Sequence, residues 1–237
     1  MKTLGIIGGL SWESSAEYYR IINQEVNKRL GGVHSAKMLL ASLDFGEIEK
    51  LQVAGRWDEL TQELIFWARS LENAGASGIL ISSNTMHHSA KEVQSAIGVP
   101  LLHIADATGR AIVEAGYKKV GLLGTSFTME GDFYNQRLSE AFDLEVILPE
   151  REEREVIHRV IYDELVVGNI LPESRQKFLD MIQRMGQKGC EGMILGCTEI
   201  PLLVTQALTS VPLFDTTALH CAAAVHFMLG SSHLRNE

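Results

Sequence analysis

Short apolar runs alternate along the chain with longer segments in which apolar residues recur at helical spacing. The runs lie within residues 2–8, 75–81, 99–102, 118–124, 189–195 and 211–214, and glycine or proline bounds each of them. Short bounded runs of this kind are typical of buried β-strands. Helical spacing of apolar residues marks residues 14–30, 58–74 and 174–188. Strands that alternate with helices predict right-handed βαβ units and a parallel sheet covered by helices on both faces.

The chain also repeats itself. Three segments of the first half resemble three of the second half, in the same order and at nearly the same separation: KTLGIIG (2–8) and KKVGLLG (118–124), GASGILI (75–81) and GCEGMIL (189–195), VPLL (99–102) and VPLF (211–214). Repeats in register indicate a duplicated supersecondary unit. We therefore predict an α/β protein of two similar three-layer α/β/α domains with parallel sheets, related by a pseudo-twofold axis. The first domain would hold residues 1–100 plus 211–237 and the second residues 101–210, with the C-terminal helices crossing over.

Ligands of open α/β sheets bind beyond the carboxyl ends of the strands. Two such sheet ends facing each other would form an active site in an interdomain cleft. The loop that follows the first strand contains Leu10, and its repeat partner contains Thr128. We expect both loops to line the cleft, although the hydroxyl groups of the second loop could instead cap the helix that follows.

Composition narrows the class of protein. The 237 residues carry a formal net charge of −9, with 46% hydrophobic and 22% charged residues, the balance of a soluble globular protein. This charge argues against nucleic-acid and anionic-membrane partners. No signal peptide and no apolar stretch of about 20 residues is evident, so we expect a cytoplasmic protein. The three cysteines form no metal or disulfide pattern, and no GxGxxG motif indicates a dinucleotide.

The repeat pairs Ser83 with Cys197 and Asn84 with Thr198, each just after a strand and before an expected helix. A helix N-terminus offers free N–H groups and a positive dipole end, which can hold a substrate carboxylate and favour a thiolate at Cys197. Ser83 and Cys197 would then form a proton-transfer pair on opposite faces of a bound substrate. The alternative is that Cys197 is a buried structural cysteine.

Three motifs resemble those of the aspartate/glutamate racemases: GIIGGLSWES (5–14), NTMH (84–87) and GCTEI (196–200). The resemblance covers nearly the whole chain. It implies racemisation without pyridoxal phosphate, another cofactor or a metal, by two opposed cysteines, in a protein that is usually a homodimer. Carried over, Cys197 is the second catalytic cysteine. Asn84, Thr85 and Thr198 would bind the substrate around its α-carboxylate, and Glu199 belongs to the same motif.

The residue in place of the first cysteine is Ser83, as in the L-aspartate/glutamate-specific branch that this chain most resembles. A hydroxyl is a weaker acid than a thiol and needs an activating neighbour to act as a base. Two interpretations follow. Ser83 donates or relays a proton, which gives a slow or stereochemically biased racemase, or the site is engineered or degenerate and exchanges protons on one face only. His87 and His88 are close in sequence but are expected to project from a following helix.

The expected substrate is aspartate or glutamate, and its distal carboxylate needs a donor. Gln52 is preferred over Arg56 for this role, since arginine is commonly a solvated surface residue. Two alternatives to racemisation stay open. The chain could be a one-cysteine decarboxylase or cis–trans isomerase of the same superfold, or a pseudoenzyme that binds a dicarboxylate without turnover.

Overall fold

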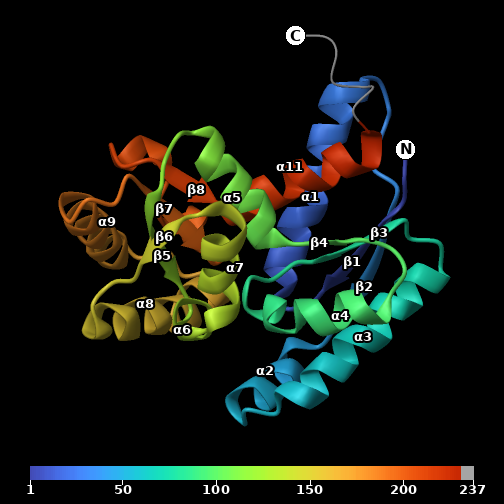
Figure 1. Cartoon of the computed structure of the whole chain (residues 1–237), viewed down its shortest axis with the longest axis horizontal. Coiled ribbons are helices and arrows are strands. Elements are labelled where there is room, and N and C mark those ends of the chain that lie inside the picture. The colour runs from blue at the N-terminus through green and yellow to red at the C-terminus, as the bar shows by residue number, and fades with distance from the viewer. Residues whose placement is uncertain (231–237) are drawn as a thin grey trace. The chain divides into compact units, whose positions relative to one another are not determined.

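Two four-stranded parallel sheets organise the chain in the computed structural model, which describes residues 1–230 (Figure 1). The first sheet has the order β2-β1-β3-β4 and the second the order β6-β5-β7-β8. Within the described residues, each of the six strand pairings is parallel. The same strand order in both sheets, with helices flanking each, confirms the prediction of two similar α/β domains.

The first sheet and its helices come from both ends of the chain. The elements are β1 (Leu4–Gly8), α1 (Trp12–Leu30), β2 (Met38–Ser42), α2 (Phe45–Val53), α3 (Trp57–Asn73), β3 (Gly78–Ile81), the 3₁₀ helix η1 (Thr85–Ser89), α4 (Ala90–Ala96), β4 (Leu101–Leu102) and α11 (Thr216–Leu229). The helices expected at residues 14–30 and 58–74 are confirmed as α1 and α3.

The second sheet is built from the middle of the chain. Its elements are α5 (Ile104–Glu114), β5 (Lys119–Gly124), α6 (Ser126–Glu130), α7 (Asp132–Phe142), β6 (Glu145–Ile147), α8 (Arg151–Asp163), η2 (Leu165–Val167), α9 (Pro172–Gln187), α10 (Ile200–Leu203), η3 (Gln206–Leu208) and β8 (Leu213–Asp215), with β7 (Gly192–Gly196) between α9 and α10. The helix expected at residues 174–188 is confirmed as α9.

The chain divides by internal contacts into one unit of Met1–His103 with the segment from His220 onward, and a second unit of Ile104–Leu219. These limits differ from the boundaries predicted at residues 100 and 211. Strand β4 pairs with β3 and so belongs to the first sheet. Strand β8 pairs with β7, which places residues 213–215 in the second sheet. Hydrogen bonding of the short edge strands therefore decides where the units meet along the chain.

The core of the first unit lies on both faces of its sheet, because successive side chains of a strand point to opposite faces. Leu4 and Ile6 of β1 pack in one cluster with Tyr18 of α1 and Val225 of α11. Ile7 packs in the other cluster with residues of α3 and α4, and Figure 1 shows these two helices on the side of the sheet away from α1 and α11. The strand is apolar throughout because both of its faces are covered.

The core of the second unit forms one cluster of buried side chains. Phe178 and Ile182 of α9 pack in it with Leu122 of β5 and Ile194 of β7. The apolar positions that predicted this helix are therefore its buried face.

A glycine at the end of β1 sets the path of the first loop. Gly9 has a φ of 71°, and a Cβ at this position would lie 2.1 Å from the backbone oxygen of Leu43. Only glycine tolerates this conformation and this approach together. The loop that begins helix α1 is therefore held close to the segment that follows β2.

Across residues 1–230, no helix combines the length and the apolar character that crossing a membrane would require.

Candidate active site

Ser83 lies just beyond the end of β3, in a turn whose other residues are mostly buried. Its side chain is partly exposed, whereas Ser82, Asn84, Thr85 and Met86 are buried. The Met86 N–H donates to Ser83 Oγ at 3.4 Å. Among the residues described, no side chain accepts the proton of the Ser83 hydroxyl. The hydroxyl is therefore better suited to donate a proton than to remove one.

Serine hydroxyls tie the end of β3 to the start of α1. Ser14 Oγ donates to the backbone oxygen of Ser82 at 3.0 Å, and Ser82 Oγ donates to the backbone oxygen of Ile7 at 3.2 Å. The Gly9 N–H donates to Ser15 Oγ at 2.8 Å. Buried polar groups with partners make a rigid support. Ser82, the residue before Ser83, is thereby held by both its backbone oxygen and its side chain.

The other site residues predicted for the first unit are buried. Asn84 is 4% and Thr85 8% exposed, directly after Ser83. Gln52 is 3% exposed on α2, and its Nε2 has no hydrogen-bond partner among the residues described. Leu10 is 5% exposed and packs in the hydrophobic cluster with Ile7. Any contact of Leu10 with a ligand would therefore come from its backbone.

The predicted residues of the second unit meet at the end of β7. The Cys197 thiol donates to Glu199 Oε2 at 2.9 Å, and Thr198 Oγ1 donates to the same oxygen at 2.6 Å. Glu199 is 4% exposed, while Cys197 and Thr198 are partly exposed. One buried carboxylate oxygen thus receives both neighbouring side-chain protons.

Burial raises the pKa of the Cys197 thiol well above its usual range, and the Glu199 carboxylate raises it further by charge and by hydrogen bonding. We expected a helix N-terminus to favour the thiolate. The helix that follows, α10, has only 4 residues. Loss of hydration and an adjacent negative charge outweigh its small dipole. Both effects favour the neutral thiol over the thiolate at Cys197.

Thr128 lies in α6 and is fully buried. The Thr125 side chain caps this helix and accepts from the Thr128 N–H at 3.3 Å. Helix capping, which was one of the two roles considered for these hydroxyl groups, is therefore observed for Thr125.

Arg56, the alternative to Gln52, is exposed. Its guanidinium forms an ion pair with the Glu59 carboxylate, both side chains being 55% exposed. The pair raises the pKa of Arg56 and lowers that of Glu59. This arrangement is that of a solvated surface residue.

His87 is a partner of Ser83 that the sequence analysis missed. Its Nδ1 lies 2.7 Å from the backbone oxygen of Ser83, so the ring turns back toward the strand end. The signal was the spacing of four residues, which brings a helical side chain next to the carbonyl one turn earlier.

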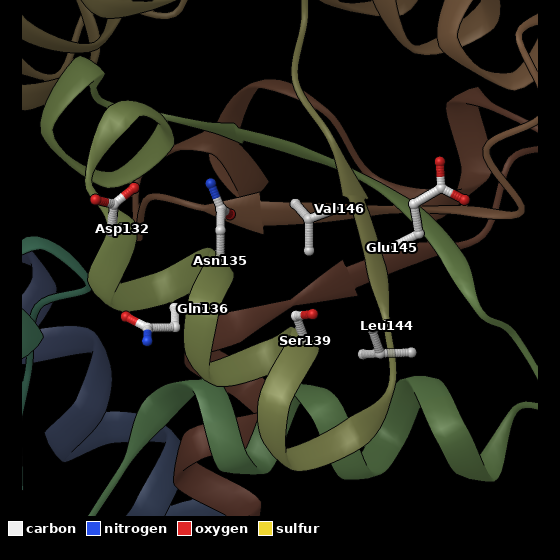
Figure 2. Close-up of a pocket in the computed structure, with 7 residues that line it drawn as sticks. All are labelled: Asp132, Asn135, Gln136, Ser139, Leu144, Glu145 and Val146. Atoms are coloured by element: carbon white, nitrogen blue, oxygen red, sulfur yellow. The ribbon is translucent and has the colours of Figure 1, made fainter.

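A separate hollow of about 600 Å³ lies on the second unit. Figure 2 shows side chains that line it, which come from α7, from the residue before β6 and from β6 itself, namely Asp132, Asn135, Gln136, Ser139, Leu144, Glu145 and Val146. It contains none of the predicted site residues. Within residues 1–230, no three His, Cys, Asp or Glu side chains gather in a way that could hold a metal ion.

Comparison with known proteins gives consistent matches. Residues 7–224 match the family model described as Asp/Glu/Hydantoin racemase. A Yersinia pestis protein named after the Asp/Glu racemases is 50% identical, with a TM-score of 0.92 over 97% of this chain and 100% of the other. An aspartate racemase homologue from Pyrococcus horikoshii OT3 is 35% identical, with a TM-score of 0.84 over the same shares. The broad specificity amino-acid racemase RacX of Bacillus subtilis (strain 168) is 26% identical over 68% of this chain and 69% of its own.

Proposed function

The chain belongs to the Asp/Glu/Hydantoin racemase family, and we propose that it interconverts the L and D enantiomers of aspartate or glutamate without pyridoxal phosphate or a metal. Proton removal from the α-carbon on one face and proton return on the other inverts the centre. The similarity to an aspartate racemase homologue at 35% identity supports the choice of a dicarboxylic amino acid.

The contact between Cys197 and Glu199 carries this proposal. A thiol that donates to a buried carboxylate at 2.9 Å can pass its proton to that carboxylate when a substrate arrives. The resulting thiolate removes the α-proton, and the electron pair delocalises into the substrate carboxylate. Glu199 then holds the proton that came from the thiol, and the new S–H holds the one that came from the substrate.

Ser83 takes the opposite role in the proposed reaction. Its hydroxyl donates a proton to the other face of the planar intermediate. Solvent then reprotonates the serine oxygen, and Glu199 releases its proton to solvent, which restores the starting state. The Met86 N–H, directed at Ser83 Oγ, stabilises the oxygen while it is negatively charged. Because no described side chain accepts the hydroxyl proton, Ser83 serves better as acid than as base. We therefore propose a racemase with a kinetic bias toward the direction in which Ser83 donates.

Polar side chains near the two catalytic groups would hold the substrate. We propose Asn84, Thr85 and Thr198 for the α-carboxylate, where charge develops, and Gln52 for the distal carboxylate. The buried and unpartnered Nε2 of Gln52 supports this role, since such a donor is costly unless a ligand pairs with it. Glu199, the Leu10 backbone and Thr128 complete the proposed surroundings. As in related racemases, we propose a homodimer, which size-exclusion chromatography with light scattering would test.

The deciding experiment incubates the protein with each enantiomer of aspartate and glutamate in D₂O. Chiral chromatography follows inversion, and proton NMR follows replacement of the α-proton by deuterium. We expect both processes in the wild type, and neither in C197A. The matched control is C190A, which removes a buried thiol elsewhere in the second unit. Full activity of C197A would refute the assignment of the thiol.

The same assay separates the alternatives for Ser83. S83A should retain α-deuterium incorporation on the Cys197 face and lose inversion. S83C should raise the inversion rate in the direction that needs a base at this position, because a thiol ionises far more readily than a hydroxyl. An S83A variant that inverts as fast as the wild type would exclude Ser83 from proton transfer.

A further inference from the structure

His87 is buried beneath the turn that carries Ser83. It lies in η1 and is 2% exposed. A backbone carbonyl only accepts, so the 2.7 Å contact requires that His87 Nδ1 carries a proton and donates it to the Ser83 oxygen. Through its side chain, His87 therefore holds the backbone of Ser83, four residues earlier in the turn.

Two further imidazoles enclose His87. The ring centroid of His103 lies 4.5 Å away and that of His220 lies 5.7 Å away. His220 donates from Nε2 to the Leu102 oxygen at 2.8 Å and accepts at Nδ1 from the Tyr18 hydroxyl at 3.0 Å. These bonds fix the His220 ring. Burial lowers the pKa of His220 to about 3, and the neighbouring His87 contributes a smaller part of this shift. His87 therefore packs against a His220 ring that is held in place.

The two hydrogen bonds that reach Ser83 differ in strength. The bond from Met86 N to Ser83 Oγ is 3.4 Å long, beyond the usual range of about 2.7–3.2 Å for N–H···O bonds. The bond from His87 to the Ser83 carbonyl is 2.7 Å long, at the short end of that range. The stronger restraint on Ser83 thus acts on its backbone and comes from His87.

We propose that His87 is a positioning residue: its Nδ1–H holds the Ser83 carbonyl and so keeps the Ser83 hydroxyl directed at the α-carbon of the amino acid. The inference rests on the proposed function, in which Ser83 returns the proton. Loss of the bond leaves the turn free to rotate, and proton delivery by Ser83 slows. The step performed by Cys197 on the other face continues, and its thiol still exchanges with D₂O.

The measurable consequence is a change in the proportions of the two products, inverted and retained, that form from the planar intermediate. In D₂O, return of a deuteron by Cys197 gives exchange with retention, whereas delivery by Ser83 gives inversion. The ratio of inverted to retained deuterated product therefore falls when delivery by Ser83 slows and return by Cys197 is unchanged. A variant that is merely less folded loses both products in the same proportion and keeps the ratio.

The test compares H87N with H87Q, starting from the enantiomer of aspartate or glutamate that exchanges faster. The asparagine amide nitrogen falls near the place of imidazole Nδ1, and the glutamine amide nitrogen falls near that of Nε2. We expect H87Q to lower the inversion-to-retention ratio at least tenfold with KM within twofold of the wild type. In H87N the ratio should stay within about threefold of wild type, because the asparagine amide can still donate to the Ser83 oxygen.

H88Q is the matched control, because His88 is the exposed neighbour of His87 and stacks on Trp57. It should keep the wild-type ratio. If H87Q keeps the ratio of a racemising wild type, or if H87N loses it as fully as H87Q, the inference fails and the proposed function stands. A wild type that exchanges no α-proton would overturn both. Should H87Q not fold, H87S replaces it, since its hydroxyl is too short to reach the Ser83 oxygen.

Discussion

The Tyr18 hydroxyl donates to Nδ1 of His220 at 3.0 Å and joins α1 to α11 within the first unit. Both side chains are fully buried. With His220 Nε2 donating to the Leu102 oxygen, both ring nitrogens have a partner, and the C-terminal helix is tied to β4. Helix α11 is thus held to the first unit by polar as well as apolar contacts.

Replacing Tyr18 by phenylalanine should destabilise the protein, because His220 Nδ1 would keep its place without a donor. An unsatisfied buried acceptor costs about 1–3 kcal/mol. Urea unfolding followed by circular dichroism measures the change. The control is Y19F, at the next position and 58% exposed, which should leave stability within about 0.5 kcal/mol. Equal stability of Y18F and Y19F would show that the bond contributes little.

Stability should fall as the pH is lowered from about 6.5 toward 3. The pKa of His220 is about 3 in the folded state, against 6.5 ordinarily, because burial and the nearby His87 disfavour its charge. Within this window the unfolded chain binds a proton that the folded chain does not. The free energy of unfolding therefore rises with pH, by up to about 1.4 kcal/mol per unit from this group, and levels off above 6.5.

Urea unfolding at several pH values would test this effect. In H220Q the slope between pH 4 and 6 should flatten relative to wild type. H34Q removes an exposed imidazole and is the control. A slope that is the same in wild type and H220Q would contradict the assignment of this pH dependence to His220.

Replacing Glu199 by glutamine should lower the pKa of the Cys197 thiol and still impair the enzyme. The carboxylate charge raises that pKa, so its removal favours the thiolate, while burial keeps the pKa above its usual range. Without a proton acceptor, racemisation should slow by about 10²–10⁴-fold. The rate of Cys197 alkylation against pH, followed by mass spectrometry, measures the pKa. E191Q, which changes a carboxylate just before β7, is the control. An alkylation profile that is the same in E199Q and wild type would show that the Glu199 charge does not raise the pKa of the Cys197 thiol.

Gln52 should matter for binding and not for folding. In Q52L the unpartnered Nε2 is gone, so the free energy of unfolding should hold or rise. If Gln52 binds the distal carboxylate, KM for aspartate or glutamate should rise about 10–100-fold, the equivalent of a hydrogen bond to a charged group. R56A, four residues on and exposed just before α3, is the control. A KM that rises equally in both variants would count against a specific role for Gln52.

Most of the fold could be predicted from local patterns. The run around Leu4 and Ile7 is apolar at every position because both faces of β1 are covered, and that covering is what a parallel sheet requires. The edge strands were harder to place. The short β8 carries the same Val-Pro signal as β4, but only its hydrogen bonds to β7 assign it to the second sheet.

The order of residues by itself determined the duplicated α/β architecture and the matched strand ends that carry Ser83 and Cys197, since strand periodicity, glycine boundaries and repeats are local properties of a chain. The tertiary structure alone decided their surroundings. The protonation of Cys197 depends on burial and on Glu199, and the support of Ser83 depends on a cluster that includes His220, from the far end of the chain. Such effects arise from desolvation and from contacts through space, which no local pattern encodes.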